Sequence, residues 1–297
     1  MSERPTKALR RLLQGPEILL APGAVDGVNA RLVAEQGFKA VYMTGAGTTA
    51  TRLGMPDVGL LTMTEMVDNA QRVAEASGLP VIADADTGYG GVVNVRRTVR
   101  AYERAGVAAI HLEDQGWPKR CGHLAGKTIV PVEEMVAKIR AAVDARDDQD
   151  FHIIARTDAV AVEGYDAAIE RARRYEEAGA DVIFMEALSK MEQIREVPRI
   201  FRVPTLYNMS ASGKTPFLSA AEMQELGYRV CIYPNVLILA AIPAVLRALA
   251  TLKETGAVAG LMNEIATFRE FFDLLGMEEV QKLEAKYTVS ENARVGY

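Results

Sequence analysis

The sequence alternates short apolar runs with longer segments of helical spacing, and this alternation limits the fold more than any other feature. Eight runs rich in β-branched residues stand at 17–21, 40–44, 80–86, 108–114, 151–157, 181–187, 205–208 and 230–234. The segments between them carry apolar residues three to four positions apart, as in 95–106 and 164–180. Because parallel strands need such crossover connections, the pattern predicts a (β/α)8 barrel of the TIM type. A doubly wound open sheet is the alternative.

One phrase closes three of the predicted helices. AEQGFKAV (34–41), ERAGVAAI (103–110) and EEAGADVI (176–183) each place a glycine between a helical segment and an apolar run. Glycine ends a helix readily because it adopts the left-handed conformation at little cost. No linker divides the chain before about residue 255, so we expect a barrel over 1–255 and two or three extra helices over 256–297.

The composition excludes some classes of partner. The 297 residues are 49% hydrophobic and 25% charged, with a net charge of −5. Without a long Lys/Arg cluster, this balance argues against nucleic-acid binding. The longest apolar run, 236–252, contains Pro243 and Arg247, so we expect no membrane span. Two cysteines and an N-terminus without an apolar core predict a cytoplasmic protein.

Polar residues follow the predicted strands one after another, at the point where each strand ends. They are Asp84, Asp86, Glu113, Asp114, Arg156, Asp158, Glu186, Asn208 and Tyr233. Any one of them alone is more often a helix cap or a loop residue. In a barrel, however, the carboxyl ends of the strands form the face that carries the active site. Their shared position therefore predicts a site at that face.

Three acidic residues of this set suggest a metal. Asp84 and Asp86 lie two positions apart on one predicted strand, so their side chains share a face, and Glu113 ends the next strand. Carboxylates without a cysteine or histidine cluster favour a hard cation such as Mg²⁺, with Mn²⁺ possible in its place. The alternative is a hydrogen-bonded carboxylate cluster without a metal.

Other residues point to a small anionic substrate. The TGAG segment at 44–47 exposes backbone N–H groups after the second strand, which suits a carboxylate or phosphate. Arg156 at the mouth of a barrel is a good bidentate partner for an oxyanion. Cys121 lies in an unusual loop, EDQGWPKRCGHLAGK (113–127), among glycines and basic residues.

These pieces occur in an order that resembles one superfamily. The segments are PGAVDG, YMTGAG, PDVGLLT, DADTGYG, HLEDQ, PKRCGH, ARTDA, YNMS, GKTP and YP. The chain is similar to the isocitrate lyase and phosphoenolpyruvate mutase superfamily over roughly residues 10–290. KRCGH (119–123) resembles the signature of the carbon–carbon lyase branch, which includes 2,3-dimethylmalate and 2-methylisocitrate lyases. The resemblance implies a barrel whose last helix is swapped between subunits, in a homotetramer built as a dimer of dimers.

The resemblance also assigns residue roles. Asp84, Asp86 and Glu113 would hold Mg²⁺, partly through water, and Asp57 would position a metal-bound water. Substrate-binding roles would fall to Thr44, Gly45, Ala46, Gly122, His123, Glu186, Asn208 and Thr215. Arg156 would bind the C2 oxygen of the substrate, and Tyr42 and Cys121 would handle protons. The C-terminal extension would pack on a neighbouring subunit.

The implied reaction cleaves the C2–C3 bond of a 2-hydroxy dicarboxylate, giving an α-oxo acid such as pyruvate and a second carboxylate. The departing carbanion must be protonated, and the Cys121 thiol can donate that proton. We expect Lys119, Arg120 and His123 to lower the pKa of this thiol below about 8.5. Three glycines, 116, 122 and 126, predict that the loop closes as a lid. Cys231 is expected to be a core residue.

Departures from the pattern bear on the substrate. Ala211 stands where relatives carry a glutamate, Phe268 stands at the place of an arginine of methylisocitrate lyases, and Pro234 stands at the place of a serine of oxaloacetate-hydrolysing relatives. We therefore expect lyase activity on 2,3-dimethylmalate or a close 2-alkylmalate. Oxaloacetate hydrolysis, carbon–phosphorus chemistry and a non-catalytic binding protein are the alternatives.

Overall fold

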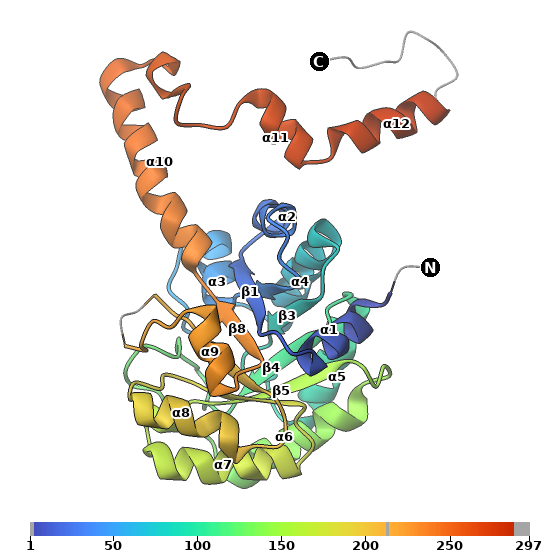
Figure 1. Ribbon diagram of the computed structural model, residues 1–297, viewed down its shortest axis with the longest axis vertical. Helices are drawn as coiled ribbons and strands as arrows, with labels where there is room; N and C mark the ends of the chain where they lie inside the picture. The colour runs from blue at the N-terminus through green and yellow to red at the C-terminus, as the bar shows by residue number, and fades with distance from the viewer. Residues whose placement is uncertain (1–2, 212–213, 288–297) are drawn as a thin grey trace. The chain divides into compact units, whose positions relative to one another are not determined.

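The computed structural model describes residues 3–211 and 214–287 and shows a closed barrel of parallel strands (Figure 1). The strands are β1 (Leu19–Ala24), β2 (Val41–Met43), β3 (Val81–Asp84), β4 (Ala109–Glu113), β5 (His152–Thr157), β6 (Val182–Met185), β7 (Thr205–Asn208) and β8 (Val230–Tyr233). Each pairs with the next, and β1 pairs with β8 from Leu19 beside Val230 to Pro22 beside Tyr233. This closure confirms the predicted TIM-type barrel and excludes the open sheet.

Helices connect the strands on the outside of the barrel. They are α1 (Pro5–Gln14), α2 (Gly27–Glu35), α3 (Gly45–Leu53), α4 (Met63–Ser77), α5 (Val92–Arg104), α6 (Val132–Ala145), α7 (Tyr165–Glu177), α8 (Met191–Ile200), α9 (Ala220–Leu226) and α10 (Val236–Thr255). Two short 3-10 turns, Ala159–Ala161 and Ala259–Leu261, interrupt the loops. Gly37, Gly106 and Gly179 follow α2, α5 and α7 with φ of 79°, 81° and 104°, so the repeated phrase ends helices as predicted.

Two apolar layers hold the barrel together. One fills the barrel interior and includes Tyr42, Ile82, Ile154 and Phe184. The other lies between the strands and the surrounding helices. Cys231 is fully buried in this second layer, as expected. Because side chains fill the interior, the barrel is a packed core, and functional groups are confined to its two ends.

The chain divides into two compact units, residues 1–238 and 239–297, with the boundary inside α10. The second unit contains the rest of α10 followed by α11 (Phe268–Leu274) and α12 (Met277–Tyr287), and the expected division at about residue 255 stays a prediction. Pro243 lies inside α10 without ending it. The helix is therefore long and apolar enough to cross a membrane by length and composition, contrary to our expectation, although a helix that packs on protein passes the same test.

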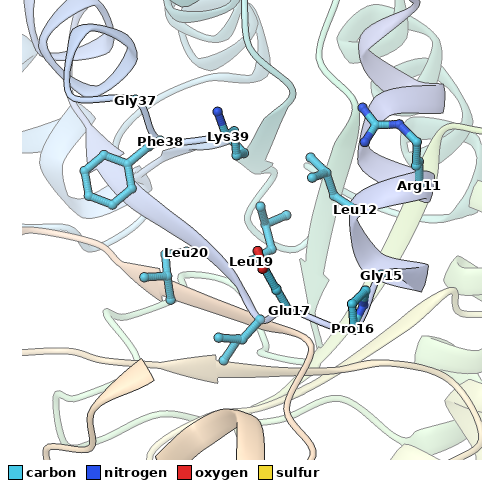
Figure 2. Close-up of a pocket in the computed structure, with 11 residues that line it drawn as sticks. Arg11, Leu12, Gly15, Pro16, Glu17, Leu19, Leu20, Gly37, Phe38 and Lys39 are labelled. Atoms are coloured by element: carbon cyan, nitrogen blue, oxygen red, sulfur yellow. The ribbon is translucent and has the colours of Figure 1, made fainter. Parts of the chain in front are cut away.

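A cavity of about 540 Å³ lies at the amino-terminal ends of the strands, the end opposite the polar residues. Figure 2 shows Leu12 and Leu19 between Arg11 of α1 and Lys39 before β2. Its lining is mostly apolar, and it contains none of the residues singled out in the sequence. This cavity is therefore separate from the candidate site.

Candidate active site

The predicted polar residues do gather at the carboxyl ends of the strands. Asp84, Glu113 and Asn208 are the last residues of β3, β4 and β7. Arg156 lies one residue before the end of β5, and Glu186 lies one residue after β6. All of these side chains except the half-buried Asn208 are buried. The parallel barrel thus brings residues from five strands to one end.

Arg156 is the centre of the polar contacts. Its Nε and Nη2 donate to Asp158 at 3.0 and 3.2 Å. Its Nη1 lies 3.2 Å from Glu113 Oε2, and its Nη2 lies 3.4 Å from Glu186 Oε2. The guanidinium carbon also lies 5.2 Å from the centre of the Phe184 ring. Three carboxylates hold one guanidinium in place, which preorganises a positive charge for an oxyanion.

Glu186 joins Arg156 to the far end of the site. His123 Nε2 lies 2.9 Å from Glu186 Oε1, and Asn208 Nδ2 donates to both carboxylate oxygens at 3.1 Å. Burial works against the charged form of Glu186, but the charge of Arg156 and the contact with His123 outweigh it and lower the pKa to about 2. Glu186 is therefore ionised near neutral pH. These residues come together as predicted, although their roles stay predictions.

Lys119 lies among the acidic residues rather than beside the thiol. Its Nζ is 2.6 Å from Asp86 Oδ1 and 2.7 Å from Asp57 Oδ1. Asp86 itself follows β3 in the left-handed region, with φ of 47°. Asp84 and Asp86 therefore do not share a strand face, and that step of the sequence argument was wrong. They meet because the turn folds back, and the Asp86 N–H donates to Asp84 Oδ1 at 2.9 Å.

Tyr42, His111 and Asp84 form a buried chain of polar groups. The Tyr42 hydroxyl lies 2.9 Å from His111 Nε2, which lies 3.6 Å from Asp84 Oδ1. Burial raises the pKa of Tyr42 well above its ordinary value and lowers the pKa of His111 to about 4. Both groups are thus neutral at pH 7. Sequence reasoning missed His111, whose inward direction on β4 was the available signal.

The TGAG segment begins α3. Thr44 is its N-cap, and its side chain accepts from the Gly47 N–H at 3.2 Å. A Cβ on Gly45 would lie 2.3 Å from Asp84 Oδ2, so only glycine lets the helix begin this close to the carboxylate. The half-buried Ala46 follows. The N–H groups of this first turn suit a carboxylate ligand, and that role stays a prediction.

The loop that carries Cys121 is fixed at its base and closes over the site. The Gly116 N–H donates to the Thr128 carbonyl at 2.8 Å, and Gln115 exchanges two hydrogen bonds with the backbone of Arg120. A Cβ on Gly122 would lie 2.4 Å from Arg156 Nη2 and 2.7 Å from Glu186. The backbone beside the thiol therefore touches the guanidinium, and a larger residue than glycine would not fit.

The expected lowering of the Cys121 pKa was wrong. Burial is the largest effect and raises the pKa of this thiol, against a smaller opposing effect of the His123 backbone. Lys119 is engaged by carboxylates, and Arg120 is exposed. The thiol therefore stays protonated near neutral pH, which is the form that a proton donor needs. The proposed role of the thiol as a proton donor therefore does not require a lowered pKa.

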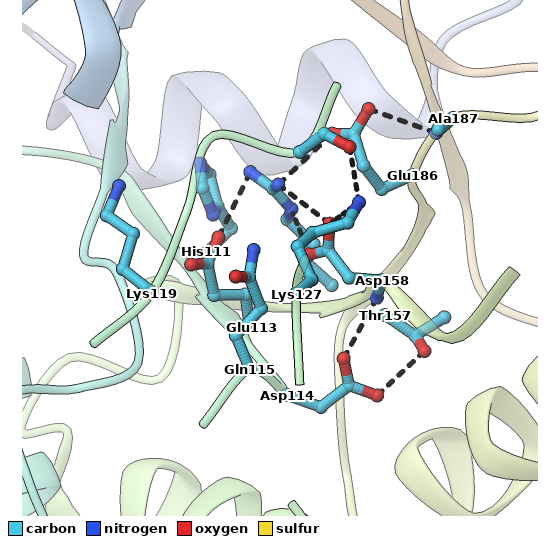
Figure 3. Close-up of polar contacts among 12 residues, drawn as sticks. His111, Glu113, Asp114, Gln115, Lys119, Lys127, Thr157, Asp158, Glu186 and Ala187 are labelled. Atoms are coloured by element: carbon cyan, nitrogen blue, oxygen red, sulfur yellow. Dashed lines mark hydrogen bonds and ion pairs between the residues drawn. The ribbon is translucent and has the colours of Figure 1, made fainter. Parts of the chain in front are cut away.

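Supporting residues hold Asp158 in place, and Lys127 among them was not foreseen from the sequence. Lys127 Nζ donates to the Gly122 carbonyl and, at 2.8 Å, to Asp158 Oδ1 (Figure 3). Asp114 accepts from Thr157 Oγ1 at 2.7 Å and from the Asp158 N–H at 2.9 Å. Asp114 and Lys127 thus fix Asp158, which in turn holds Arg156. The sequence pointed to these two residues only through their positions, because Asp114 follows a strand and Lys127 ends the loop.

The remaining predicted positions are Thr215, Ala211 and Phe268. Thr215 is buried and Ala211 is exposed. Residues 212 and 213, part of the segment expected to add polar groups here, lie outside the described residues. Phe268 belongs to the second compact unit, where its ring packs 4.6 Å from the Phe272 ring. The expectation that Phe268 faces a substrate stays a prediction.

The donor set fits a hard cation held partly through water. Across residues 3–211 and 214–287, no three His, Cys, Asp or Glu side chains are arranged to hold a metal directly. Glu113 Oε1 is nevertheless buried and accepts no hydrogen bond from a described residue. Carboxylates of Asp84, Asp86 and Asp57 lie on the same side of the site, with Lys119 among them. Mg²⁺ suits such a set because it retains waters and uses few protein ligands.

Comparison with known proteins gives consistent matches along the chain. The family model described as phosphoenolpyruvate phosphomutase matches residues 9–253. The chain is 50% identical to 2,3-dimethylmalate lyase of Eubacterium barkeri, over 94% of this chain and 96% of that protein. It is 44% identical to 2-methylisocitrate lyase of Aeropyrum pernix, over 96% of this chain and 91% of that protein.

Solved structures agree in fold and extent. A crystal structure of 2,3-dimethylmalate lyase aligns with a TM-score of 0.93 at 40% identity, covering 100% of both chains. A structure of phosphonopyruvate hydrolase in complex with oxalate and Mg²⁺ aligns with a TM-score of 0.88 at 31% identity, covering 96% of this chain and 99% of that one. The extent of the match in sequence and the agreement in fold lead to one conclusion. The chain belongs to the phosphoenolpyruvate mutase and isocitrate lyase superfamily.

Proposed function

We propose that this protein is a Mg²⁺-dependent carbon–carbon lyase that cleaves a 2-alkylmalate of the 2,3-dimethylmalate type into an α-oxo acid and a second carboxylate. The observation that carries the proposal is the contact of the Cys121 loop with Arg156 and Glu186 through Gly122. Because Gly122 is the neighbour of Cys121, this contact supports a thiol close to the guanidinium that would bind the substrate oxygen. The named lyases at 50% and 44% identity support this reaction class.

The metal would be held by Asp84, Asp86 and Glu113, with Asp57 on a bound water. When bound, Mg²⁺ would supply positive charge that polarises the substrate carboxylate and C2 oxygen. A structure within the superfamily contains Mg²⁺ with oxalate, which is a small dicarboxylate. The buried Glu113 Oε1 without a described hydrogen-bond partner supports this assignment. Mn²⁺ has the same preference for oxygen ligands and is expected to replace it.

Substrate binding would use both ends of the site. The N–H groups at the start of α3, from Gly45 and Ala46, would bind the carboxylate of the oxo-acid half. Arg156 would bind the C2 oxygen, because its three carboxylate partners hold the guanidinium in one orientation. Glu186 and Asn208, joined at 3.1 Å, would contact the other fragment.

Bond cleavage requires two proton transfers. The C2 hydroxyl loses its proton as the ketone forms, and Tyr42 would accept it while passing its own proton to His111 Nε2 at 2.9 Å. The electron pair of the C2–C3 bond stays on C3 of the departing carboxylate. The Cys121 thiol would then protonate that carbon. Burial keeps the thiol in its neutral form until the carbanion appears.

Partners and location follow from the same assignment. A small dicarboxylate is the expected substrate, and no nucleic-acid or membrane partner is proposed. We propose a homotetramer in which α10 is exchanged between subunits. We also propose a cytoplasmic location, which the similarity to bacterial metabolic lyases supports.

A comparison of substrates tests the function. We expect the highest kcat/KM on 2,3-dimethylmalate or a close 2-alkylmalate, lower values on methylisocitrate and little hydrolysis of oxaloacetate. The reason is that an apolar side chain such as Phe268 cannot pair with a third carboxylate, and Pro234 offers no donor for a hydrated ketone. The highest kcat/KM on methylisocitrate would show that Arg269 or another cation reaches the substrate. Dominant oxaloacetate hydrolysis would contradict the lyase assignment.

A further inference from the structure

A positively charged hollow lies on α5, and the proposed reaction does not use it. The cavity measures about 550 Å³ and is lined by Met63, Val93, Arg96, Arg97, Arg100, Ala101 and Arg104. Its volume lies within the range of about 300–1,000 Å³ that is usual for small-molecule sites. Four arginines of one helix line it, although the chain as a whole has a net charge of −5.

These arginines have no acidic partners in the described part of the chain. None of the four forms an ion pair there, and Arg100 Nε donates only to the Ala145 carbonyl at 3.4 Å. One carboxylate on α4 and one on α5 have other partners. Asp68 of α4 pairs with Arg52 and Arg72, and Glu103 of α5 accepts from the backbone N–H groups of residues 147 and 148. The positive charge of the hollow is therefore not neutralised from within the barrel.

The spacing of the arginines works against the helix that carries them. Arg96, Arg100 and Arg104 follow one another at four-residue intervals, and Arg97 lies three residues before Arg100. Like charges at these spacings are neighbours on the helix surface and destabilise it. Met63 and Val93 add apolar surface beside the charges. A bound anion would relieve this repulsion and would occupy a preformed cavity.

The opposite face of α5 has a structural role. Tyr102 OH donates to the Asp84 carbonyl at 2.9 Å, and Thr98 Oγ1 donates to the Gly88 carbonyl at 3.2 Å. This face therefore supports the end of β3, whereas in the described part of the chain the four arginines make one side-chain hydrogen bond, from Arg100 Nε to the Ala145 carbonyl. The two faces can be changed separately, because none of the residues that line the hollow belongs to the proposed catalytic set.

We propose that the arginine hollow of α5 binds a small molecule that carries two or more phosphate groups, such as pyrophosphate or a nucleoside diphosphate. Guanidinium groups bind phosphate oxygens through paired N–H donors. Four of them suit a ligand with several negative charges better than a single carboxylate. The apolar residues of the lining would contact the part of the ligand that is not phosphate.

Calorimetric titration of inorganic pyrophosphate in metal-free buffer tests the proposal with three proteins. They are the unmodified chain, the double variant R97Q/R100Q, and the matched control R173Q/R174Q on exposed positions of α7. Both double variants remove two positive charges, so they separate a local site from the net charge. We expect affinity to fall at least about tenfold in R97Q/R100Q and to change little in the control. Circular dichroism and lyase activity should show that R97Q/R100Q stays folded.

Three results would overturn the proposal. Equal affinity in all three proteins would place the pyrophosphate elsewhere, including the active site. An equal loss in both double variants would show that only net charge matters. A change in sedimentation of R97Q/R100Q with unchanged pyrophosphate affinity would identify the hollow as a contact between subunits.

Discussion

Cys121 shows how the environment of a side chain decides its chemistry. The neighbouring sequence is basic, but the folded loop turns Lys119 toward Asp57 and Asp86 and leaves Arg120 exposed. Burial then has the largest effect and raises the pKa of the thiol. The charges of neighbouring residues in a sequence therefore do not predict whether a pKa is raised or lowered, because the fold sets the direction of each side chain. The identity of the thiol was predictable, but its electrostatic setting was not.

The substitution Cys121→Ser tests the proton donor. We expect kcat to fall by about 10²–10⁴-fold, because a hydroxyl is a much weaker acid than a thiol. Ligand binding should be retained, since Gly122 and Arg156 keep their contacts. In the unmodified protein, activity should persist to a pH above about 8.5 and fall as the thiol ionises, and a measured pH profile checks this. A near-normal kcat for Cys121→Ser would exclude the thiol as the donor.

The acidic residues predict dependence on a divalent cation. Treatment with EDTA should abolish activity, and added Mg²⁺ or Mn²⁺ should restore it, because Lys119 alone cannot neutralise the buried carboxylates of Asp86, Glu113 and Asp57. The variant Asp86→Asn should need a higher Mg²⁺ concentration for half-maximal activity. Arg173→Gln, on the far helix α7, is the control. Full activity after exhaustive chelation would contradict the metal assignment.

The strands and helices could be predicted from the periodicity of apolar residues, whereas the turns between them could not. The predicted run 205–208 matches β7, and the other seven runs overlap β1 to β6 and β8. The run 80–86 was too long, because β3 ends at Asp84 and Asp86 lies in a turn with positive φ. Apolar spacing reports which face is buried, but it carries no information about where a turn reverses the chain.

The loop from 116 to 126 is predicted to act as a lid. Its ends are paired through Gly116 and Thr128, and Gly126 adopts a positive φ of 80°, which glycine tolerates at little cost. We expect proteases to cut this loop in the ligand-free protein and to cut it more slowly with Mg²⁺ and pyruvate. The variant Lys127→Met should increase cutting, because the lysine joins the Gly122 carbonyl to Asp158. Equal cutting with and without ligand would contradict the lid.

For the whole molecule, the apolar periodicity predicted the barrel, whereas only the family resemblance suggested what surrounds α10. The barrel follows from contacts within the chain, since each strand pairs with its neighbours. In contrast, α10 is apolar along its length and has no buried residue in the described structure. An apolar cavity of about 300 Å³ lies open between α2 and strands β1 and β8, lined by Leu20, Leu32, Phe38 and Tyr233 among others. Both features support the proposal that another protein surface covers this region.

A second copy of the chain is the partner that we propose. In this arrangement, α10 of one subunit covers the apolar cavity of the other. Leu239, Ile242, Leu246 and Leu249 form one stripe on α10 and are 48%, 49%, 61% and 56% exposed. Burying a side chain of this size contributes roughly 1.5–3 kcal/mol, so four of them give a substantial driving force for association. Sedimentation should show a tetramer for the unmodified protein and smaller species for L246E/L249E, because buried carboxylates without partners are costly. The control Arg247→Glu adds a carboxylate about 100° away on the helix and should stay tetrameric. If L246E/L249E remains tetrameric, the α10 stripe does not form the interface.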